Sequence, residues 1–349
     1  MADIKVKHGL EILRTSKRYG NLYELAFTQD NLYLAYLDAR KGKRKKVGTY
    51  TFEKSLGSNL DSLFNELKTQ TYTPLPYREF EVYEPKKRVI QAPEFRDLIV
   101  QHAIYRVIYN IFNSSFIDTS FACRKNGGTH KASNYTQKEM RTYDSDRYTL
   151  KLDIRKFFYS IDRDILKKLF EKKIKDKKFV NLMMVFADAN TSKVGIPIGN
   201  LLSQIYSLVY LNELDHYVKR VLKVKSYVRY VDDFVLIGLT LEEAKIMQRK
   251  CEEFVKEKLN LELSHWHILK IKRGINFVGY RTWKSAKFVR KHTLYKFKKA
   301  VIKQKISSIV SIIGHAKGTK TLSYFKKIVE SYMPNYSLLP NRSIKCLNM

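Results

Sequence analysis

The chain has 349 residues, with 66 Lys and Arg against 34 Asp and Glu and a formal net charge of +32 at pH 7. This length allows two or three subdomains, and so large a positive excess favours a polyanionic partner such as nucleic acid. No run approaches the ~20 apolar residues of a membrane span. The N-terminus lacks an apolar signal segment, and the three cysteines have no metal-site spacing. We therefore expect a cytoplasmic protein without a membrane partner.

The first half of the chain predicts basic helices and one hairpin. A helix over about 25–37 leads into the basic cluster 40–46, which fits a solvated loop, a nucleic-acid contact or a targeting signal. Further elements follow from periodicity and turn residues. They are an amphipathic helix over 58–73, paired strands at 80–83 and 88–91 joined by a basic turn, a helix over 95–113, a basic glycine-containing loop at 121–130 and a helix to about 142.

The second half alternates strands with helices and ends in a basic helical region. The expected elements are a strand ending at Asp153, a Lys-rich helix, a loop at 195–204 leading into an apolar helix over 202–218, a helix over 242–259, strands at 261–271 and 275–282, helices from 290 and a Pro/Asn/Ser-rich tail over 334–349.

The stretch 226–238 has the pattern of two buried strands with Asp232 and Asp233 at the turn between them. An isolated Asp-Asp pair usually marks an ordinary solvated hairpin tip. Here the flanks are strongly apolar, and Asp153 ends another strand upstream. Carboxylates that meet at one sheet edge are the hard oxygen ligands that would hold two Mg²⁺ ions for a phosphoryl displacement.

Several motifs together resemble the reverse transcriptases over roughly residues 75–330. Leu152-Asp153-Ile154-Arg155-Lys156-Phe157-Phe158 resembles the family's first catalytic motif, and Tyr230-Val231-Asp232-Asp233 resembles its YxDD box. Gly195-Ile196-Pro197-Ile198-Gly199, followed by Ser203-Gln204, is similar to the template-positioning loop. Gly274-Ile275-Asn276-Phe277-Val278-Gly279-Tyr280 is similar to the primer grip. Segments 88–93 and 121–124 resemble the upstream finger motifs.

This resemblance implies an α+β right-hand polymerase with an antiparallel palm sheet and a basic helical thumb. The expected parts are an N-terminal extension (1–75), fingers (76–147), a palm (148–283, with a fingers insertion around 163–200) and a thumb with the C-terminal tail (284–349).

The resemblance also assigns roles at the reaction centre. Asp153, Asp232 and Asp233 are the expected catalytic carboxylates, and the first two would bridge two Mg²⁺ ions with the Ile154 carbonyl as a further ligand. Asp233 would contribute more weakly, or only stabilise the turn. Phe158 would collide with a ribose 2′-hydroxyl, unless it is a core aromatic beside Phe157. The other expected nucleotide-binding residues are Lys86, Lys87, Arg88, Ile198, Gly199 and Gln204.

Further positions are expected to contact nucleic acid or move a proton. The nucleic-acid set is Arg124, Gly279, Tyr280, Lys296, Lys298, Lys299 and Lys303. A general acid for the leaving pyrophosphate is expected at His267, where the family often has Lys, or at Lys270; a lone His on a strand is more often structural. The partners implied are an RNA template, a DNA or RNA primer and dNTPs, with a structured non-coding RNA and an accessory protein subunit as further candidates.

Within the family, the segments 198–204 and 264–277 look most like reverse transcriptases of diversity-generating retroelements, although Leu202 stands where that group has Thr. Bacterial reverse transcriptases of anti-phage defence share much of the pattern. An RNA-templated RNA polymerase or cyclase-type palm is disfavoured by Phe158. A non-catalytic RNA-binding protein is disfavoured by the three intact carboxylates, which repel nucleic acid unless metals neutralise them.

Overall fold

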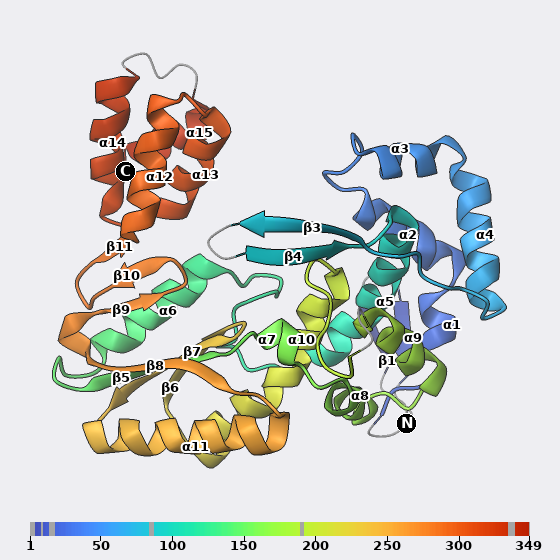
Figure 1. Cartoon of the computed structure of the whole chain (residues 1–349), viewed down its shortest axis with the longest axis horizontal. Coiled ribbons are helices and arrows are strands. Elements are labelled where there is room, and N and C mark those ends of the chain that lie inside the picture. The colour runs from blue at the N-terminus through green and yellow to red at the C-terminus, as the bar shows by residue number, and fades with distance from the viewer. Residues whose placement is uncertain are drawn as a thin grey trace. The chain divides into compact units, whose positions relative to one another are not determined.

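The computed structural model describes residues 18–83, 87–188, 192–333 and 339–348, together with the backbone of two short paired strands, β1 (Ile4–Lys7) and β2 (Leu10–Leu13). The chain divides into two compact units, each assembled from separate stretches of sequence (Figure 1). Unit 1 comprises Met1–Ile117, Arg155–Asp215 and Glu253–Glu262; unit 2 comprises Asp118–Ile154, His216–Glu252 and Leu263–Met349.

Unit 1 is mainly helical, and its longest helix forms the centre of its core. This helix, α5 (Phe95–Asn113), buries residues along most of its length and packs against α2 (Gln29–Ala39). Side-chain caps begin three helices, from Thr28, Asp162 and Asp176, because each oxygen accepts an otherwise unpaired backbone N–H. The other helices are α1 (Leu22–Ala26), α3 (Val47–Lys54), α4 (Leu56–Lys68), α7 (Phe157–Ser160), α8 (Arg163–Glu171), α9 (Lys177–Ala187) and α10 (Leu201–His216).

Unit 1 also contains the predicted hairpin of β3 (Arg78–Tyr83) and β4 (Lys87–Ala92), which pair antiparallel. Every residue of β3 is exposed. Alternation along the strands places Phe80, Val82, Arg88 and Ile90 on one face. The other face carries the hydrogen bond from Gln91 to Glu79 and the ion pair of Lys87 with Glu81. The hairpin therefore presents one face that is largely apolar, with Arg88 near the turn.

Unit 2 is built on a four-stranded antiparallel sheet in the order β6-β7-β5-β8 (Figure 1). The strands are β5 (Tyr148–Ile154), β6 (Ser226–Tyr230), β7 (Asp233–Leu239) and β8 (Leu263–Lys270). Leu150, Leu152, Phe234 and Leu236 are fully buried on one face. Helix α6 (Thr129–Arg141) packs against β6 and β7 on the other face, where Val235 and Ile237 share a core with Ala132 and Met140. Helix α11 (Leu241–Leu259) follows the sheet in sequence.

The single strand expected over 275–282 is wrong, because this segment folds into two strands. These are β9 (Ile275–Phe277) and β10 (Tyr280–Thr282), which pair with each other, and β10 pairs in turn with β11 (Lys287–Val289). Val278 and Gly279 between them have φ angles of 44° and 90°. Two successive positive φ values make a tight hairpin turn, which the sequence Asn-Gly usually indicates. Val278 stands at the first position of this turn, and a β-branched residue there does not predict a turn.

Helices form the C-terminal part of unit 2, as predicted. They are α12 (Lys291–Ile302), α13 (Ile306–Ala316), α14 (Thr321–Tyr332) and α15 (Asn341–Leu347), around a core that includes the stacked rings of Phe297 and Phe325. Helix α15 lies within the Pro/Asn/Ser-rich tail, where the sequence analysis expected no separate element. The mixture of helices and antiparallel sheet confirms the α+β class. None of the helices described is both long and apolar enough to cross a membrane.

Candidate active site

The sheet of unit 2 brings the three predicted carboxylates to one end. Asp153 and Asp233 are directly opposite each other on β5 and β7, and Asp232 lies in the turn that joins β6 to β7. The Ile154 N–H donates to the Asp232 carbonyl at 3.3 Å, which ties the end of β5 to this turn. Asp153 and Asp232 are 79 positions apart in the chain, yet both lie at the same end of the sheet.

Asp233 is held by a lysine that the sequence reading missed. The Lys151 ammonium lies 2.9 Å from Asp233 Oδ2 and also donates to the Asn276 carbonyl of β9 at 3.0 Å. Burial raises the pKa of the Asp233 carboxyl to about 6, against the opposing effect of Lys151 and with a further rise from Asp153 and Asp232. Lys151 lies two positions before Asp153, so strand alternation puts both on one face, which is the signal the sequence did contain.

The carboxylates fit a divalent cation. Asp233 Oδ1 is buried and has no hydrogen-bond partner within the described residues, and neighbouring carboxylates raise the pKa of Asp233. A bound cation would relieve both penalties. Side chains alone do not complete a ready-made site: among the described residues, no group of three or more His, Cys, Asp or Glu stands close enough to hold a metal. In this structure the Lys151 ammonium forms an ion pair with the other carboxylate oxygen of Asp233, Oδ2.

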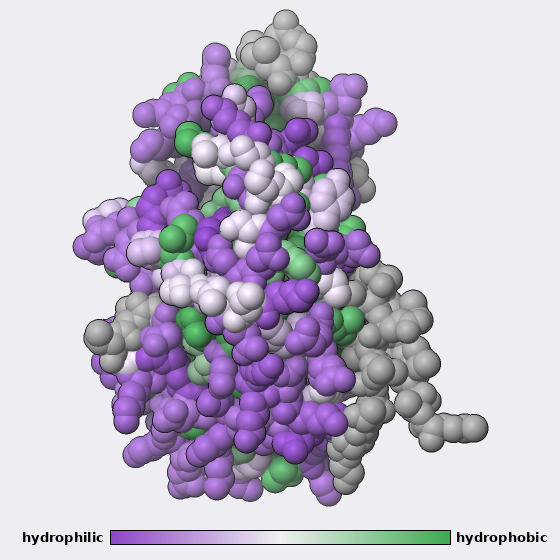
Figure 2. Space-filling model, turned by 90° about the vertical axis from the view of Figure 1, so that its right-hand side faces the viewer, coloured by the Kyte–Doolittle hydropathy of each residue, from purple (hydrophilic) through white to green (hydrophobic). Residues whose placement is uncertain are grey.

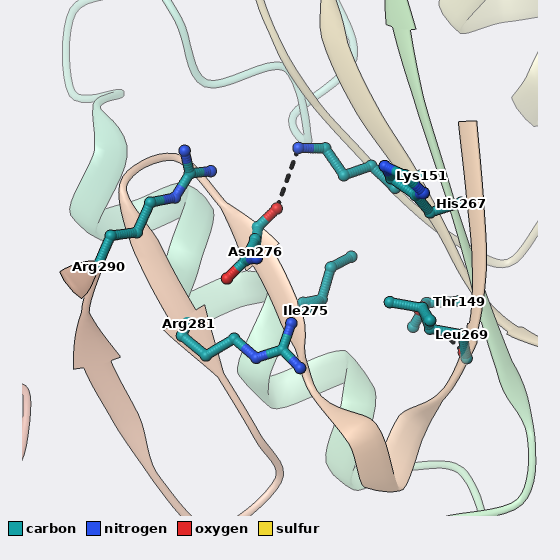
Figure 3. Close-up of a pocket in the computed structure, with 8 residues that line it drawn as sticks. All are labelled: Thr149, Lys151, His267, Leu269, Ile275, Asn276, Arg281 and Arg290. Carbon is teal, nitrogen blue, oxygen red and sulfur yellow. Dashed lines mark hydrogen bonds between the residues drawn. The ribbon is translucent and has the colours of Figure 1, made fainter. Parts of the chain in front are cut away.

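A basic pocket of about 290 Å³ lies beside Lys151 (Figure 3). Lys151, His267, Arg281 and Arg290 contribute cationic or imidazole groups to its wall, and none of its lining residues is acidic. His267 is the direct neighbour of Lys151 across β5 and β8, two positions from the neighbour of Asp153. Lys270 instead contacts Asp146 and pairs with Tyr148 at the other end of β5. Of the two candidate general acids, the geometry favours His267.

In unit 1, one loop connects several of the predicted nucleotide-binding residues. This nucleotide loop, residues 195–200, receives a 2.7 Å hydrogen bond from the Gln91 N–H of β4 at the Ile198 carbonyl. The Ile196 N–H donates to the Phe158 carbonyl at 2.8 Å. Gly199 has φ of 111°, and a Cβ built there would lie 2.7 Å from Ile90 Cγ2 and 3.1 Å from the Gln91 carbonyl. Glycine is therefore required where the loop meets the hairpin.

The nucleotide loop is also anchored at the start of α10. The Asn200 amide donates to Tyr77 Oη at 2.7 Å and to the Phe186 carbonyl at 3.0 Å, while its oxygen accepts the Leu202 N–H at 2.8 Å. Gln101 Oε1 accepts the Leu201 N–H at 3.1 Å. These buried amide contacts hold the backbone of the loop. They leave the half-buried Ile198 side chain and the exposed Gly199 and Gln204 at its surface.

Phe158 is half-buried, and its ring centroid lies 5.5 Å from that of the buried Phe157. The preceding Lys156 has φ of 45°, so a left-handed residue turns the chain out of β5 and into α7. Burial separates the two neighbouring aromatics: Phe157 belongs to the core, and Phe158 retains an exposed part. That part is what a role against a sugar ring requires.

The hairpin places Arg88 on an exposed strand position. Lys87 instead forms an ion pair with Glu81 at 2.7 Å on the opposite face. Lys86 lies outside the described residues. Arg88 is thus the better placed of the two described cations for a triphosphate, since Lys87 already has a carboxylate partner.

The predicted nucleic-acid contacts differ in exposure. Lys298, Lys299 and Lys303 are exposed at α12 and its end, and Lys296 is half-buried. Arg124 donates to the Ser120 carbonyl at 3.0 Å within its own loop. Tyr280 is fully buried, and its hydroxyl donates to the His315 carbonyl at 2.7 Å. Its ring is therefore part of the core and is not available to contact a primer, whereas Gly279 is half-buried. Figure 2 shows that hydrophilic residues cover most of one molecular face.

Comparison with known proteins identifies the family of this chain. Residues 83–282 match the family model described as reverse transcriptase (RNA-dependent DNA polymerase). Protein YkfC of Escherichia coli is 26% identical over 288 residues, covering 69% of this chain and 74% of YkfC. The group II intron-encoded protein LtrA of Lactococcus lactis is 24% identical over 340 residues, covering 75% of this chain and 56% of LtrA.

Among solved structures, a telomerase from Candida albicans bound to a fragment of telomeric RNA gives a TM-score of 0.47 at 13% identity, covering 82% of this chain and 60% of that one. That likeness is too slight to carry an argument. The family model, in contrast, covers more than half of the chain and includes all three carboxylates. The chain therefore belongs to the reverse transcriptases, the family of RNA-dependent DNA polymerases.

Proposed function

We propose that this chain copies an RNA template into DNA by metal-assisted nucleotidyl transfer at Asp153 and Asp232. The observation that carries the proposal is the convergence of Asp153, Asp232 and Asp233 at one end of the sheet. In addition, a buried oxygen of Asp233 has no hydrogen-bond partner among the residues that the structure describes. Membership of the reverse transcriptase family supplies the reaction class. Its substrates are a primer 3′-hydroxyl and a deoxynucleoside triphosphate paired with the RNA template.

The three carboxylates contribute unequally to metal binding. Asp153 and Asp232 would hold two Mg²⁺ ions, with the Ile154 carbonyl as a further ligand. The bound ions would lower the pKa of the attacking hydroxyl and stabilise charge on the leaving oxygen. Asp233 contributes less directly, because Lys151 already partly neutralises it. His267 would deliver a proton to the departing pyrophosphate, with Lys270 less well placed.

The nucleotide would be bound by groups of unit 1. Arg88 offers a planar fork of donors to the triphosphate, with Lys86 and Lys87 as additional positive charges. The nucleotide loop would support the base pair through Ile198 and Gly199, next to Gln204. The exposed lysines of α12 would neutralise duplex phosphates, so log affinity should fall by roughly 0.7–0.9 per log salt for each phosphate contact.

Phe158→Ala is expected to admit ribonucleotides. The exposed part of the Phe158 ring would contact the ribose 2′ position, and its removal leaves space for the hydroxyl. We expect the ratio of rNTP to dNTP incorporation on one primed RNA template to rise by about tenfold or more, equivalent to ~1.4 kcal/mol of discrimination. Phe157→Leu is the matched control and should lower the melting temperature without changing that ratio. An unchanged ratio in Phe158→Ala would return this residue to a purely structural role.

We further propose that DNA synthesis by this chain is error-prone and belongs to a retroelement of the diversity-generating type. The support is the resemblance of segments 198–204 and 264–277 to that group, together with Ile198. Conventional reverse transcriptases carry Gln at the position of Ile198, and its amide can engage the template and nucleotide. Ile198 is anchored through its carbonyl, which accepts the Gln91 N–H. Its side chain is a hydrocarbon, so it supplies shape and no hydrogen bond.

Ile198→Gln is therefore expected to lower the error rate. A hydrogen bond to a buried partner is worth about 1–3 kcal/mol, or roughly 5- to 150-fold in selectivity if it is fully expressed in the transition state. Deep sequencing of cDNA made by both proteins on one template measures the effect. A low error rate in the unmodified protein, or no change in the variant, would leave Ile198 as a packing residue and favour a defence polymerase.

Two other roles remain candidates. A reverse transcriptase of anti-phage defence would copy a non-coding RNA with the same chemistry, whereas a non-catalytic RNA-binding protein would have no use for the carboxylate cluster. Sequencing the nucleic acid that co-purifies with the protein separates them. A retroelement template repeat or a structured non-coding RNA, each with its cDNA, distinguishes the first two roles. RNA without any cDNA, from cells supplied with the native template, would favour the third. Proteins that co-purify would identify any accessory subunit.

A further inference from the structure

Arg229 is a fully buried arginine three positions before Asp232. It lies on β6, has 0% relative exposure, and is among the largest side chains buried to this extent. Burying a guanidinium is costly unless it forms well-aligned hydrogen bonds. Such a residue in an edge strand beside the carboxylate cluster therefore needs a reason.

The backbone of Arg229 is fixed on the outer edge of β6. Its N–H donates to the Thr119 carbonyl at 3.0 Å, and its carbonyl accepts the Phe121 N–H at 3.1 Å. These two bonds form a parallel bridge between Ser120 and Arg229. Residues 119–121 thus hold β6, the strand that leads into the turn with Asp232.

The side chain of Arg229 contacts the turn itself. Its Nη1 donates to the Val231 carbonyl at 2.9 Å. Val231 has φ of 58°, a left-handed conformation that is a genuine outlier for a β-branched residue. The next carbonyl, that of Asp232, accepts the Ile154 N–H. Both carbonyls of the turn therefore accept a hydrogen bond, one from Arg229 and one from Ile154.

We propose that Arg229 is a positioning residue that keeps Val231 left-handed and so aims the Asp232 carboxylate. Arg229 acts through the turn, because its side chain is fully buried and its Nη1 donates to the Val231 carbonyl. Strained backbone at functional sites persists only where its surroundings over-determine it, and the guanidinium supplies that constraint. Lysine could keep the charge but would lack the planar fork that reaches the carbonyl. The inference rests on the proposed metal-binding role of Asp232.

The first test is Mn²⁺ binding, measured by electron paramagnetic resonance on the full chain without nucleic acid. Arg229→Lys should weaken binding by about tenfold, and Asp232→Asn should remove the same binding. The control is Arg106→Lys on α5, another arginine with ion-pair and amide partners, which should lose stability but keep Mn²⁺ affinity. In DNA synthesis, folded Arg229→Lys should have a kcat lower by up to about a hundredfold, because a small misplacement of reacting groups can cost that much. Its KM for dNTP should stay within about twofold of the unmodified protein.

The second test is rescue by a residue that accepts the left-handed conformation. Asparagine does so far more readily than valine, so adding Val231→Asn to Arg229→Lys should recover most of the lost Mn²⁺ affinity. This double variant also serves if the single variant does not fold. Any one of three outcomes would overturn the proposal. Arg229→Lys could keep its Mn²⁺ affinity and its kcat per folded molecule, Val231→Asn could fail to rescue the lost affinity, or both variants could fail to fold. Mn²⁺ results as expected in a protein that makes no DNA would instead contradict the polymerase assignment alone.

Discussion

Asp232→Asn is expected to lower Mg²⁺-dependent DNA synthesis by at least about a thousandfold, or ~4 kcal/mol of transition-state stabilisation. Asn keeps the shape of the side chain but cannot supply the negative charge that a bridging metal ligand needs. Because Asp232 raises the pKa of Asp233, its neutralisation should also lower that pKa from about 6. Extension of a primed RNA template measures the first effect, alongside thermal melting and RNA binding.

The melting temperature of Asp232→Asn should stay the same or rise, because one of three clustered like charges is removed. Asp146→Asn is the matched control: Asp146 pairs with Lys270 and Lys272 just before the other end of β5. That variant should retain synthesis. Appreciable synthesis by a folded Asp232→Asn protein would contradict the two-metal assignment. Loss of folding would instead indicate that Asp232 serves the turn.

Gly199→Ala is expected to reduce kcat/KM for dNTP by about 10- to 100-fold, because small displacements of positioning groups cost up to about a hundredfold. The added Cβ would lie 2.7 Å from Ile90 Cγ2, in a backbone conformation with φ of 111° that alanine rarely adopts. The loop must then move away from β4, which breaks the 2.7 Å bond from Gln91 to Ile198. Steady-state kinetics with varied dNTP on an RNA template gives the measurement.

Gly57→Ala is the control for this substitution. Gly57 lies in α4, and a Cβ there would have nothing within 4 Å. We expect normal kinetics and up to ~1 kcal/mol of added stability, since alanine is the better helix former. If Gly199→Ala kept wild-type kinetics with the same melting behaviour, the nucleotide loop would not be part of the nucleotide site.

The elements that the sequence predicted well are those whose signals are local. Helix α5 is found over the expected residues, and α4, α11 and the β3–β4 and β6–β7 hairpins differ only at their ends, because periodicity and turn residues specify them. The hairpin of β9 and β10 was missed since Val278 occupies a turn position that normally selects Gly or Asn. Helix α15 was missed because a short polar segment is stabilised by burial of Cys346 and Leu347, which composition does not reveal.

The candidate site divides in the same way. The flanking strands of Asp153, Asp232 and Asp233 are local signals in the sequence, and in the structure the register of β5 and β7 puts Asp153 opposite Asp233. Lys151 and Arg229 were not identified, because their roles depend on which atoms long-range folding brings to them. Lys151 reaches both Asp233 and the Asn276 carbonyl, 125 residues away. Burial of the Tyr280 ring is likewise a tertiary effect.

Single-nucleotide addition on four RNA templates tests the central claim most directly. The templates differ only at the first templating base, and each is annealed to the same primer and incubated with one dNTP at a time and Mg²⁺. We predict preferential addition of the complementary dNTP on every template, abolished by chelation of the metal and by Asp232→Asn. Addition that ignores the templating base, or no addition by a folded protein that binds the primed RNA, would contradict the assignment of this chain as an RNA-directed DNA polymerase.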